Sequence, residues 1–87
     1  MTQDHAAELI RSDLETTHSQ GSHSVSIHIY RADEAGWWLE VVAADGNSTV
    51  WEDRFDTDEA ALGEAILAIK DEGIQSFYEN GALATRH

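Results

Sequence analysis

Residues 23–42 read HSVSIHIYRADEAGWWLEVV. Apolar and polar side chains alternate from His23 to Tyr30, and this period of two is typical of a half-buried strand. The run from Trp37 to Val42 is rich in aromatic and β-branched residues and predicts a second strand. The small and acidic residues 32–36 between them predict a hairpin loop. The stretch therefore predicts an antiparallel pair of strands.

The hairpin has one register in which the apolar side chains share a face, and in that register Arg31 lies opposite Trp37. The predicted cross-strand pairs are Ile29 with Leu39 and Ile27 with Val41 on one face, and Tyr30 with Trp38 and His28 with Glu40 on the other.

A third strand is predicted from Ser48 to Phe55, after the turn at Asp45-Gly46. Asp and Gly tolerate the positive φ of tight turns. A loop of two residues and a loop of three would put opposite faces of this strand toward the core. We favour three residues, which keeps Trp51 and Phe55 on the face of Leu39 and Val41, although Asp53 then falls on that apolar face as well.

Two helices are predicted around these strands. Ala7, Ile10, Leu14 and Thr17 recur at spacings of three and four and predict a helix over residues 4–19. The second helix follows residues 56–59, where Asp56 is a candidate N-cap. Its apolar side is formed by Leu62, Ile66 and Ile69 with Ala61 and Ala65, and its end lies at Gly73-Ile74.

The fold class is thus α+β: a three-stranded antiparallel sheet with helices packed on one face, in the order α-β-β-β-α. Residues 1–81 are expected to form a single domain with one short turn at Ile74 to Tyr78, and residues 82–87 a disordered tail. A chain of 87 residues is one domain's worth of sequence.

The charge balance restricts the choice of partner. The chain has 17 acidic and 5 basic residues, a formal net charge of −12. Direct nucleic-acid binding and attachment to an anionic membrane both depend on Lys and Arg, so neither is expected. The chain has no Cys, no apolar run of membrane-spanning length and no basic-then-apolar leader, and we expect a cytoplasmic location.

No residue pattern indicates catalysis, a metal or a cofactor. His18, His23 and His28 recur every five residues, a spacing that does not gather metal ligands on one helix or strand face. His28 opposite Glu40 is interpreted as a cross-strand contact rather than a catalytic base. Asp45-Gly46-Asn47 lacks the other ligands of a calcium loop. We expect a protein that is not an enzyme and has no cofactor.

The sheet face away from the helices is the candidate binding surface, because aromatic and aliphatic side chains on a solvated face invite a covering partner. We expect it to bind another protein, with a basic protein as the favoured class, or a second copy of the chain as a homodimer. A homodimer would form through this face or through strand Ser24 to Tyr30 as an exposed edge. Mimicry of DNA and binding of a small molecule are less favoured hypotheses. The predicted partner-binding residues are His28, Tyr30, Trp38, Glu40, Val42, Val50, Glu52 and Arg54.

The run from Val25 to Ile69 also resembles a known family. A strand, an acidic loop ending in Gly36-Trp37, a second strand, a polar hairpin and then Asp56-Thr57-Asp58-Glu59-Ala60-Ala61-Leu62 opening an Ala-rich helix are similar to the HicB-like antitoxin domain. The family's Pro-rich loop before the helix has no counterpart here, because the chain contains no Pro. The resemblance implies a three-stranded sheet with a helix, and a small basic toxin as partner.

Overall fold

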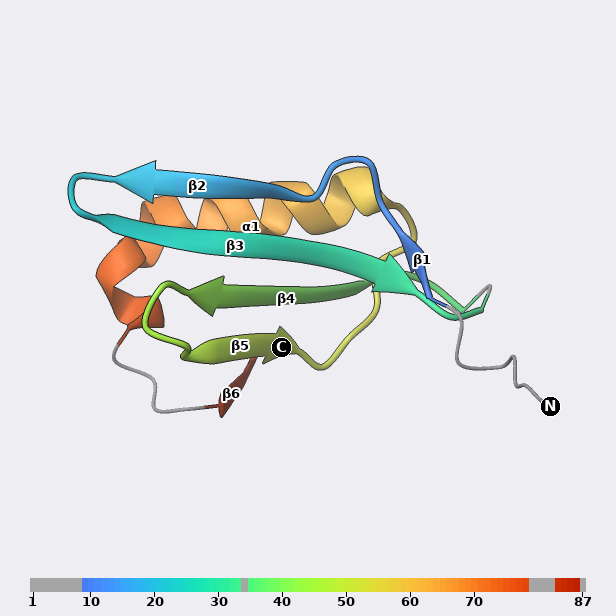
Figure 1. The fold of residues 1–87 in the computed structure, drawn as a ribbon. Coiled ribbons are helices and arrows are strands. Elements are labelled where there is room, and N and C mark those ends of the chain that lie inside the picture. The colour runs from blue at the N-terminus through green and yellow to red at the C-terminus, as the bar shows by residue number, and fades with distance from the viewer. Residues whose placement is uncertain (1–8, 34, 79–82, 87) are drawn as a thin grey trace, which may run out of the picture.

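The computed structural model describes residues 9–33, 35–78 and 83–86 of the chain. Its fold is α+β, with one layer of sheet and one long helix (Figure 1). The strands are β1 (Ile10–Arg11), β2 (Thr16–Gln20), β3 (His23–Arg31), β4 (Trp38–Ala43), β5 (Ser48–Trp51) and β6 (Leu83–Arg86). The helices are α1 (Asp58–Glu72) and the short 3-10 helix η2 (Ile74–Phe77).

The sheet is antiparallel from β1 to β5, and β3 is an interior strand, so the expectation that Ser24 to Tyr30 forms an exposed edge is wrong. Along one side β3 pairs with both β1 and β2, and along the other side it pairs with β4. The register of β3 and β4 is the predicted one, with Ile29 opposite Leu39 and Tyr30 opposite Trp38. The alternation of apolar side chains was therefore enough to determine the register of this hairpin.

The loop between β4 and β5 has the expected three residues. The N–H of Ala43 donates to the carbonyl of Asn47 at 2.8 Å, which closes the loop over residues 44–46. Thr49 and Trp51 consequently lie on the same face as Val41, and both are buried. The position of Trp51 confirms the choice of loop length.

The third strand is shorter than predicted. β5 ends at Trp51, and residues 52 and 53 bend away from the sheet. Extending the strand would have turned Asp53 toward the apolar core, where an unpaired carboxylate is costly. Phe55 returns to pair with Trp37 in an isolated bridge.

The predicted N-terminal helix is wrong over residues 9–19, and residues 4–8 lie outside the described part of the chain. Ile10–Arg11 and Thr16–Gln20 are strands, and a two-residue turn at Gly21-Ser22 joins β2 to β3. Gly21 has the positive φ, 60°, that the first position of a type II′ turn requires. The order is therefore not α-β-β-β-α, because strands occupy the place of the first helix.

A bulge separates β1 from β2 along the edge of β3. The N–H of Ser12 still donates to the Ile29 carbonyl at 2.9 Å, but the Ile29 N–H donates to the side chain of Glu15 at 3.0 Å. The Ser12 hydroxyl accepts from the N–H of Leu14 and donates to Asp58 at the start of α1, at 2.9 and 2.7 Å. Leu14 packs against the core, so the bulge ties this edge to the helix.

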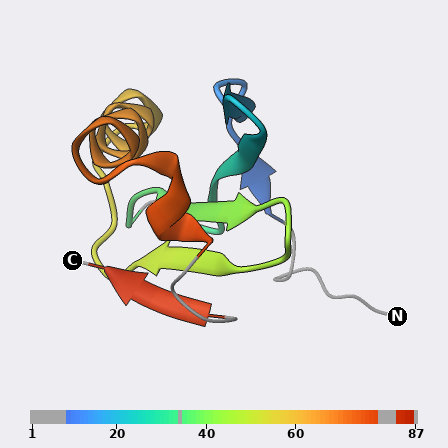
Figure 2. The same ribbon diagram turned by 90° about the vertical axis from the view of Figure 1, so that its left-hand side faces the viewer.

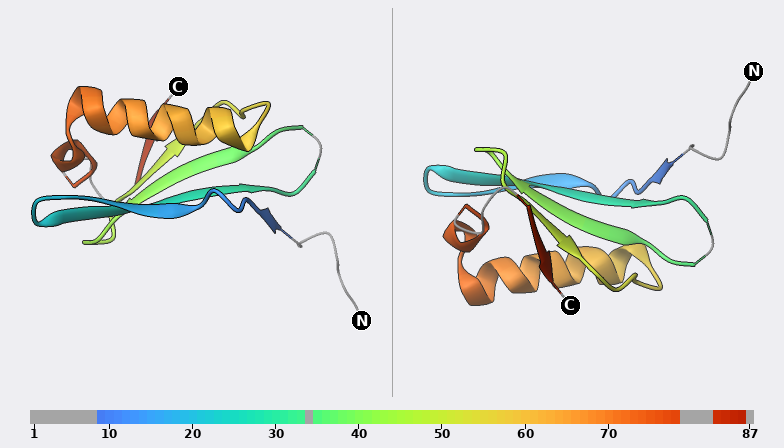
Figure 3. Two further views of the ribbon diagram at one scale, coloured as in Figure 1. Left: turned by 90° about the horizontal axis from the view of Figure 1, so that it is seen from above. Right: turned by 90° about the horizontal axis from the view of Figure 1, so that it is seen from below.

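Helix α1 covers the odd-numbered face of β3, as the alternation predicts (Figures 2 and 3). The N-cap is Thr57, whose hydroxyl accepts from the Ala60 N–H at 3.0 Å, and not Asp56. The fully buried helix residues are mainly alanines, which let the helix approach the sheet closely. The core residues are Val25, Ile27, Ile29, Leu39, Val41, Ala43, Trp51, Ala61, Ala65, Ala68, Ile69, Ile74 and Phe77.

The C-terminal residues differ from the expected tail. Leu83–Arg86 form β6, which runs parallel to β5 with Ser48 opposite Leu83. The unpaired backbone groups along the outer side of β5 give an extended segment a ladder to join. The long helix α1 lies between β5 and β6 in the chain, as a connection between parallel strands requires.

Candidate functional site

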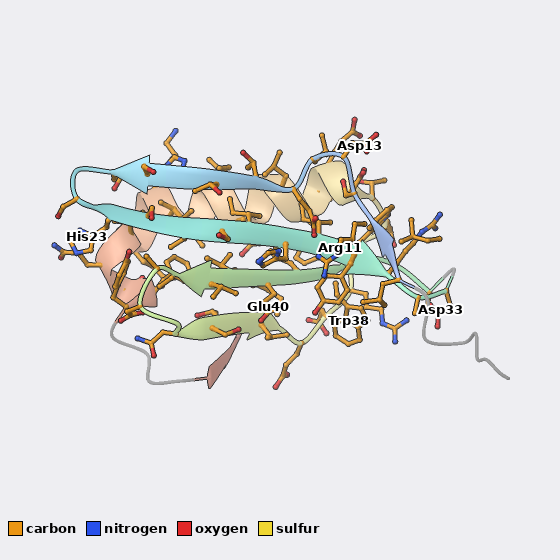
Figure 4. The ribbon with its side chains drawn as sticks, in the orientation of Figure 1. Arg11, Asp13, His23, Asp33, Trp38 and Glu40 are labelled. Atoms are coloured by element: carbon orange, nitrogen blue, oxygen red, sulfur yellow. The ribbon has the colours of Figure 1, made fainter. Side chains whose placement is uncertain are left out.

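The candidate site is the face of β3, β4 and β5 turned away from α1, which we call the open face. Figure 4 shows Trp38 and Glu40 on it, in front of the sheet, with α1 behind. No helix or strand among the described residues covers this face. Even-numbered residues of β3, β4 and β5 form it, and these are half-buried by their neighbours rather than by a second layer. They are Ser26, His28, Tyr30, Trp38, Glu40, Val42, Ser48 and Val50.

Two arginines lie over the two aromatic side chains of this face. The guanidinium of Arg11 is 5.6 Å from the centre of the Tyr30 ring, and that of Arg54 is 4.6 Å from the centre of the Trp38 ring. Tyr30 and Trp38 are themselves opposite each other in the ladder. We call these four residues the arginine-aromatic cluster.

Acidic side chains hold both arginines in place. Arg11 Nη1 lies 2.8 Å from Glu15 Oε2, and Arg54 Nη1 lies 3.1 Å from Asp33 Oδ1. Partly exposed ion pairs contribute little to folding, but they orient the guanidinium groups over the rings. Together with Glu15 and Asp33 the cluster is consequently close to neutral, although the molecule is strongly acidic.

Glu40 organises the polar part of the open face. The Tyr30 hydroxyl donates to Glu40 Oε1 at 3.4 Å, and the Ser48 hydroxyl donates to Oε2 at 2.5 Å. Burial raises the pKa of the Tyr30 phenol above its ordinary value, and the charge of Glu40 and its hydrogen bond act in the same direction. Tyr30 therefore stays neutral and serves as a hydrogen-bond donor.

The structure brings together most of the predicted partner-binding residues. His28, Tyr30, Trp38, Glu40, Val42 and Val50 share the open face. Glu52 and Arg54 lie beyond the end of β5 rather than on it, because the chain leaves the sheet after Trp51. Arg54 still reaches the face through Trp38, whereas Glu52 is exposed beyond the strand end.

His28 and Glu40 are expected to contact each other across the strands, but each side chain has a different partner in the structure. The two residues are opposite in the ladder, but His28 Nδ1 lies 3.8 Å from Glu15, which comes from the edge of the sheet. Glu40 is already engaged by Tyr30 and Ser48.

Sequence reasoning missed Arg11, Glu15 and Ser48. No sequence pattern pointed to Arg11 or Glu15 as residues of this face, because the segment that contains them is predicted as a helix. Ser48 could have been found, since the parity that places Val50 on the open face places Ser48 there too.

The described residues contain no group of three His, Cys, Asp or Glu side chains arranged to hold a metal ion. One hollow of about 460 Å³ lies at the other end of the sheet, between the β2–β3 turn and the junction of α1 with η2. It is wide open to solvent, and its lining residues include His23 and Gln75. Within the described part of the chain, no helix is long and apolar enough to span a membrane.

Comparisons with protein-family models, with curated proteins and with solved structures find no match for this chain.

Proposed function

We propose that this chain is a non-catalytic protein-binding domain whose open face docks a basic protein. The observation that carries the proposal is the pairing of Tyr30 with Trp38 on a sheet face that no described helix or strand covers. Trp, Tyr and Arg are the residue types that dominate binding energy at protein interfaces, and the arginine-aromatic cluster contains all three.

The charge of the molecule supports a basic partner. The cluster and its two acidic partners are together close to neutral, but Asp45, Glu52 and Asp53 are exposed around the open face, and the whole chain has a formal net charge of −12. Acidic residues around a binding patch attract a basic partner and raise its association rate. The resemblance of residues 25–69 to the HicB-like antitoxin domain points to the same class of partner, a small basic protein.

The test begins with capture from a lysate of the native host on the immobilised chain. Three forms are compared: the intact chain, Tyr30→Ala/Trp38→Ala, and Leu67→Ala, which alters an exposed side chain on α1. We expect one basic protein to be retained by the intact chain and by Leu67→Ala and lost from the double variant. Far-UV circular dichroism checks that all three are folded.

The purified partner then gives the quantitative measurement. Trp38→Ala should weaken its binding by at least about 30-fold, as is usual for a central aromatic residue at an interface. The association rate should fall as salt increases from about 50 to about 300 mM. Retention that the double variant leaves unchanged would rule out the open face as the binding site.

A further inference from the structure

The second interaction surface that the structure indicates is the free edge of β2. β2 forms the upper edge of the sheet in Figure 1, and no described strand pairs with its outer side. Four of its five residues, Thr16, Thr17, Ser19 and Gln20, are exposed.

The hydrogen bonds of β3 show which backbone groups of β2 point outward. The N–H and C=O of Ser24 bond to the Tyr78 hydroxyl, at 2.9 and 2.7 Å, and therefore point away from β2. Ser24 is opposite Ser19, so this is a pair without mutual hydrogen bonds. Because such pairs alternate along an antiparallel ladder, the backbone groups of Ser19 and Thr17 point to the open side of the edge.

Within β2 this edge carries no charged residue and no Pro. Exposed edge strands are usually guarded by Lys, Pro or inward-pointing charges, because an unguarded edge recruits further strands. β2 has no such residue, and the chain from Thr16 to Tyr30 contains no Asp, Glu, Lys or Arg at all. In a protein with 17 acidic and 5 basic residues, the β2–β3 hairpin is an uncharged region over residues 16–30.

The absence of charge favours a second copy of this chain as the occupant. Two copies with net charge −12 repel each other, and the repulsion is smallest where they meet through uncharged segments. An antiparallel pairing of β2 with itself is also closed by a two-fold axis, so that it ends at a dimer. A highly basic partner would instead be drawn to the acidic parts of the surface.

We propose that β2 pairs with β2 of a second copy in an antiparallel dimer centred on His18. In this register Thr17 of each copy lies opposite Ser19 of the other. All the outward N–H and C=O groups of these two residues are then satisfied across the seam. Because β2 is short, the interface is small and the dimer is a weak, concentration-dependent one.

Sedimentation equilibrium over a wide range of protein concentration, up to millimolar, tests the proposal. We expect a monomer–dimer equilibrium that strengthens as salt rises, because salt screens the repulsion between the copies. Ser19→Pro removes an outward N–H without removing a bond to β3, and should weaken the dimer by at least about tenfold. Ser19→Lys should also weaken the dimer, because it places a charge on the edge, even though it makes the net charge of each copy less negative. A monomer at every concentration would overturn the proposal.

Single cysteines test the register, since the chain has no Cys of its own. His18 would lie opposite His18 of the other copy in a pair without hydrogen bonds, where Cα atoms are about 4.5 Å apart. This distance permits a disulfide, so His18→Cys should cross-link under mild oxidation. Gln20→Cys on the same strand is the matched control, because its two copies would be about 13 Å apart. Cross-linking of Gln20→Cys but not His18→Cys would refute this register.

The experiments distinguish a failure of the edge dimer from a failure of the proposed function. A dimer lost in Tyr30→Ala/Trp38→Ala but kept in Ser19→Pro would place self-association on the open face and overturn the edge proposal. Partner binding in the Ser19 variants should remain unchanged, so a negative result at the edge says nothing against docking on the open face.

Discussion

At the scale of single residues, Gly36 and Gly63 differ in whether the structure leaves room for a side chain. Gly36 has φ of 128°, and a Cβ there would lie 2.9 Å from the carbonyl oxygen of Phe55. Gly63 lies in the exposed part of α1, with no atom within 4 Å of an added Cβ. The first position therefore needs glycine, and the second does not.

Alanine at the two positions should change stability in opposite directions. Gly36→Ala is expected to lower the free energy of unfolding by more than about 1 kcal/mol, because both the φ angle and the contact with Phe55 are unfavourable. Gly63→Ala should raise it by about 0.5–1 kcal/mol through helix propensity. Urea denaturation of the two variants and the parent measures both. Equal destabilisation by both would contradict the geometry of α1.

A second residue-scale prediction concerns the phenol of Tyr30. Its pKa is raised in the folded protein, so the unfolded chain loses this proton first as the pH rises above about 10. The contribution of Tyr30 to stability is thus complete below that pH and is lost as the pH rises through the folded pKa. Glu40→Gln should bring the pKa down toward its ordinary value. Titration of the Tyr30 ring signals by NMR measures the change, and an unaltered pKa would mean that Glu40 does not contribute to the shift.

At the scale of elements, the β3–β4 hairpin and the N-terminal segment explain what the sequence can and cannot predict. Alternation is clear in β3, because one face contacts α1 and the other does not. β2 lies at an edge and is polar on both sides, so it has no alternation to detect. The bulge then places Leu14 against the core four residues after Ile10, a spacing that imitates a helix.

The candidate site, like the fold, could be predicted from the sequence only in part. The residues of β3 and β4 on the open face follow from parity alone. The positions of Arg11 and Arg54 do not, because they depend on a bulge and on a bend after Trp51, neither of which has a periodic pattern.

The start of α1 gives an element-scale prediction. Thr57→Ala removes the hydroxyl that accepts from the Ala60 N–H and should destabilise the protein by about 1 kcal/mol. Asp56→Ala is the matched control, since Asp56 precedes the cap and is exposed; its effect should be a few tenths of a kcal/mol. Thermal or urea unfolding compares them. A larger loss in Asp56→Ala would make Asp56 the true cap.

At the scale of the whole molecule, the acidic residues and the uncharged β2–β3 hairpin occupy different regions. This separation gives the two proposed interactions opposite responses to salt. Docking of a basic protein on the open face weakens as ions screen the attraction, whereas pairing of two like-charged copies at β2 strengthens.

The net charge of −12 also predicts how the isolated chain responds to salt. Repulsion among carboxylates opposes the compact state, so about 1 M NaCl should raise the midpoint of thermal unfolding relative to about 20 mM NaCl by at least about 4 °C. Circular dichroism at low protein concentration measures the midpoint without interference from dimerisation. An unchanged midpoint would show that the acids are too far apart for their repulsion to matter.

The bulge between β1 and β2 makes the amide of Ile29 different from its neighbours in β3. Its hydrogen-bond acceptor is the side-chain carboxylate of Glu15, fourteen residues earlier, and not a backbone carbonyl. Glu15→Ala removes that acceptor and leaves the backbone carbonyl acceptors of the neighbouring amides in place. Hydrogen exchange at Ile29 should therefore lose protection in Glu15→Ala while the amides of Val25 and Ile27 keep theirs, so that one amide inside the sheet reports the presence of a side chain at its edge.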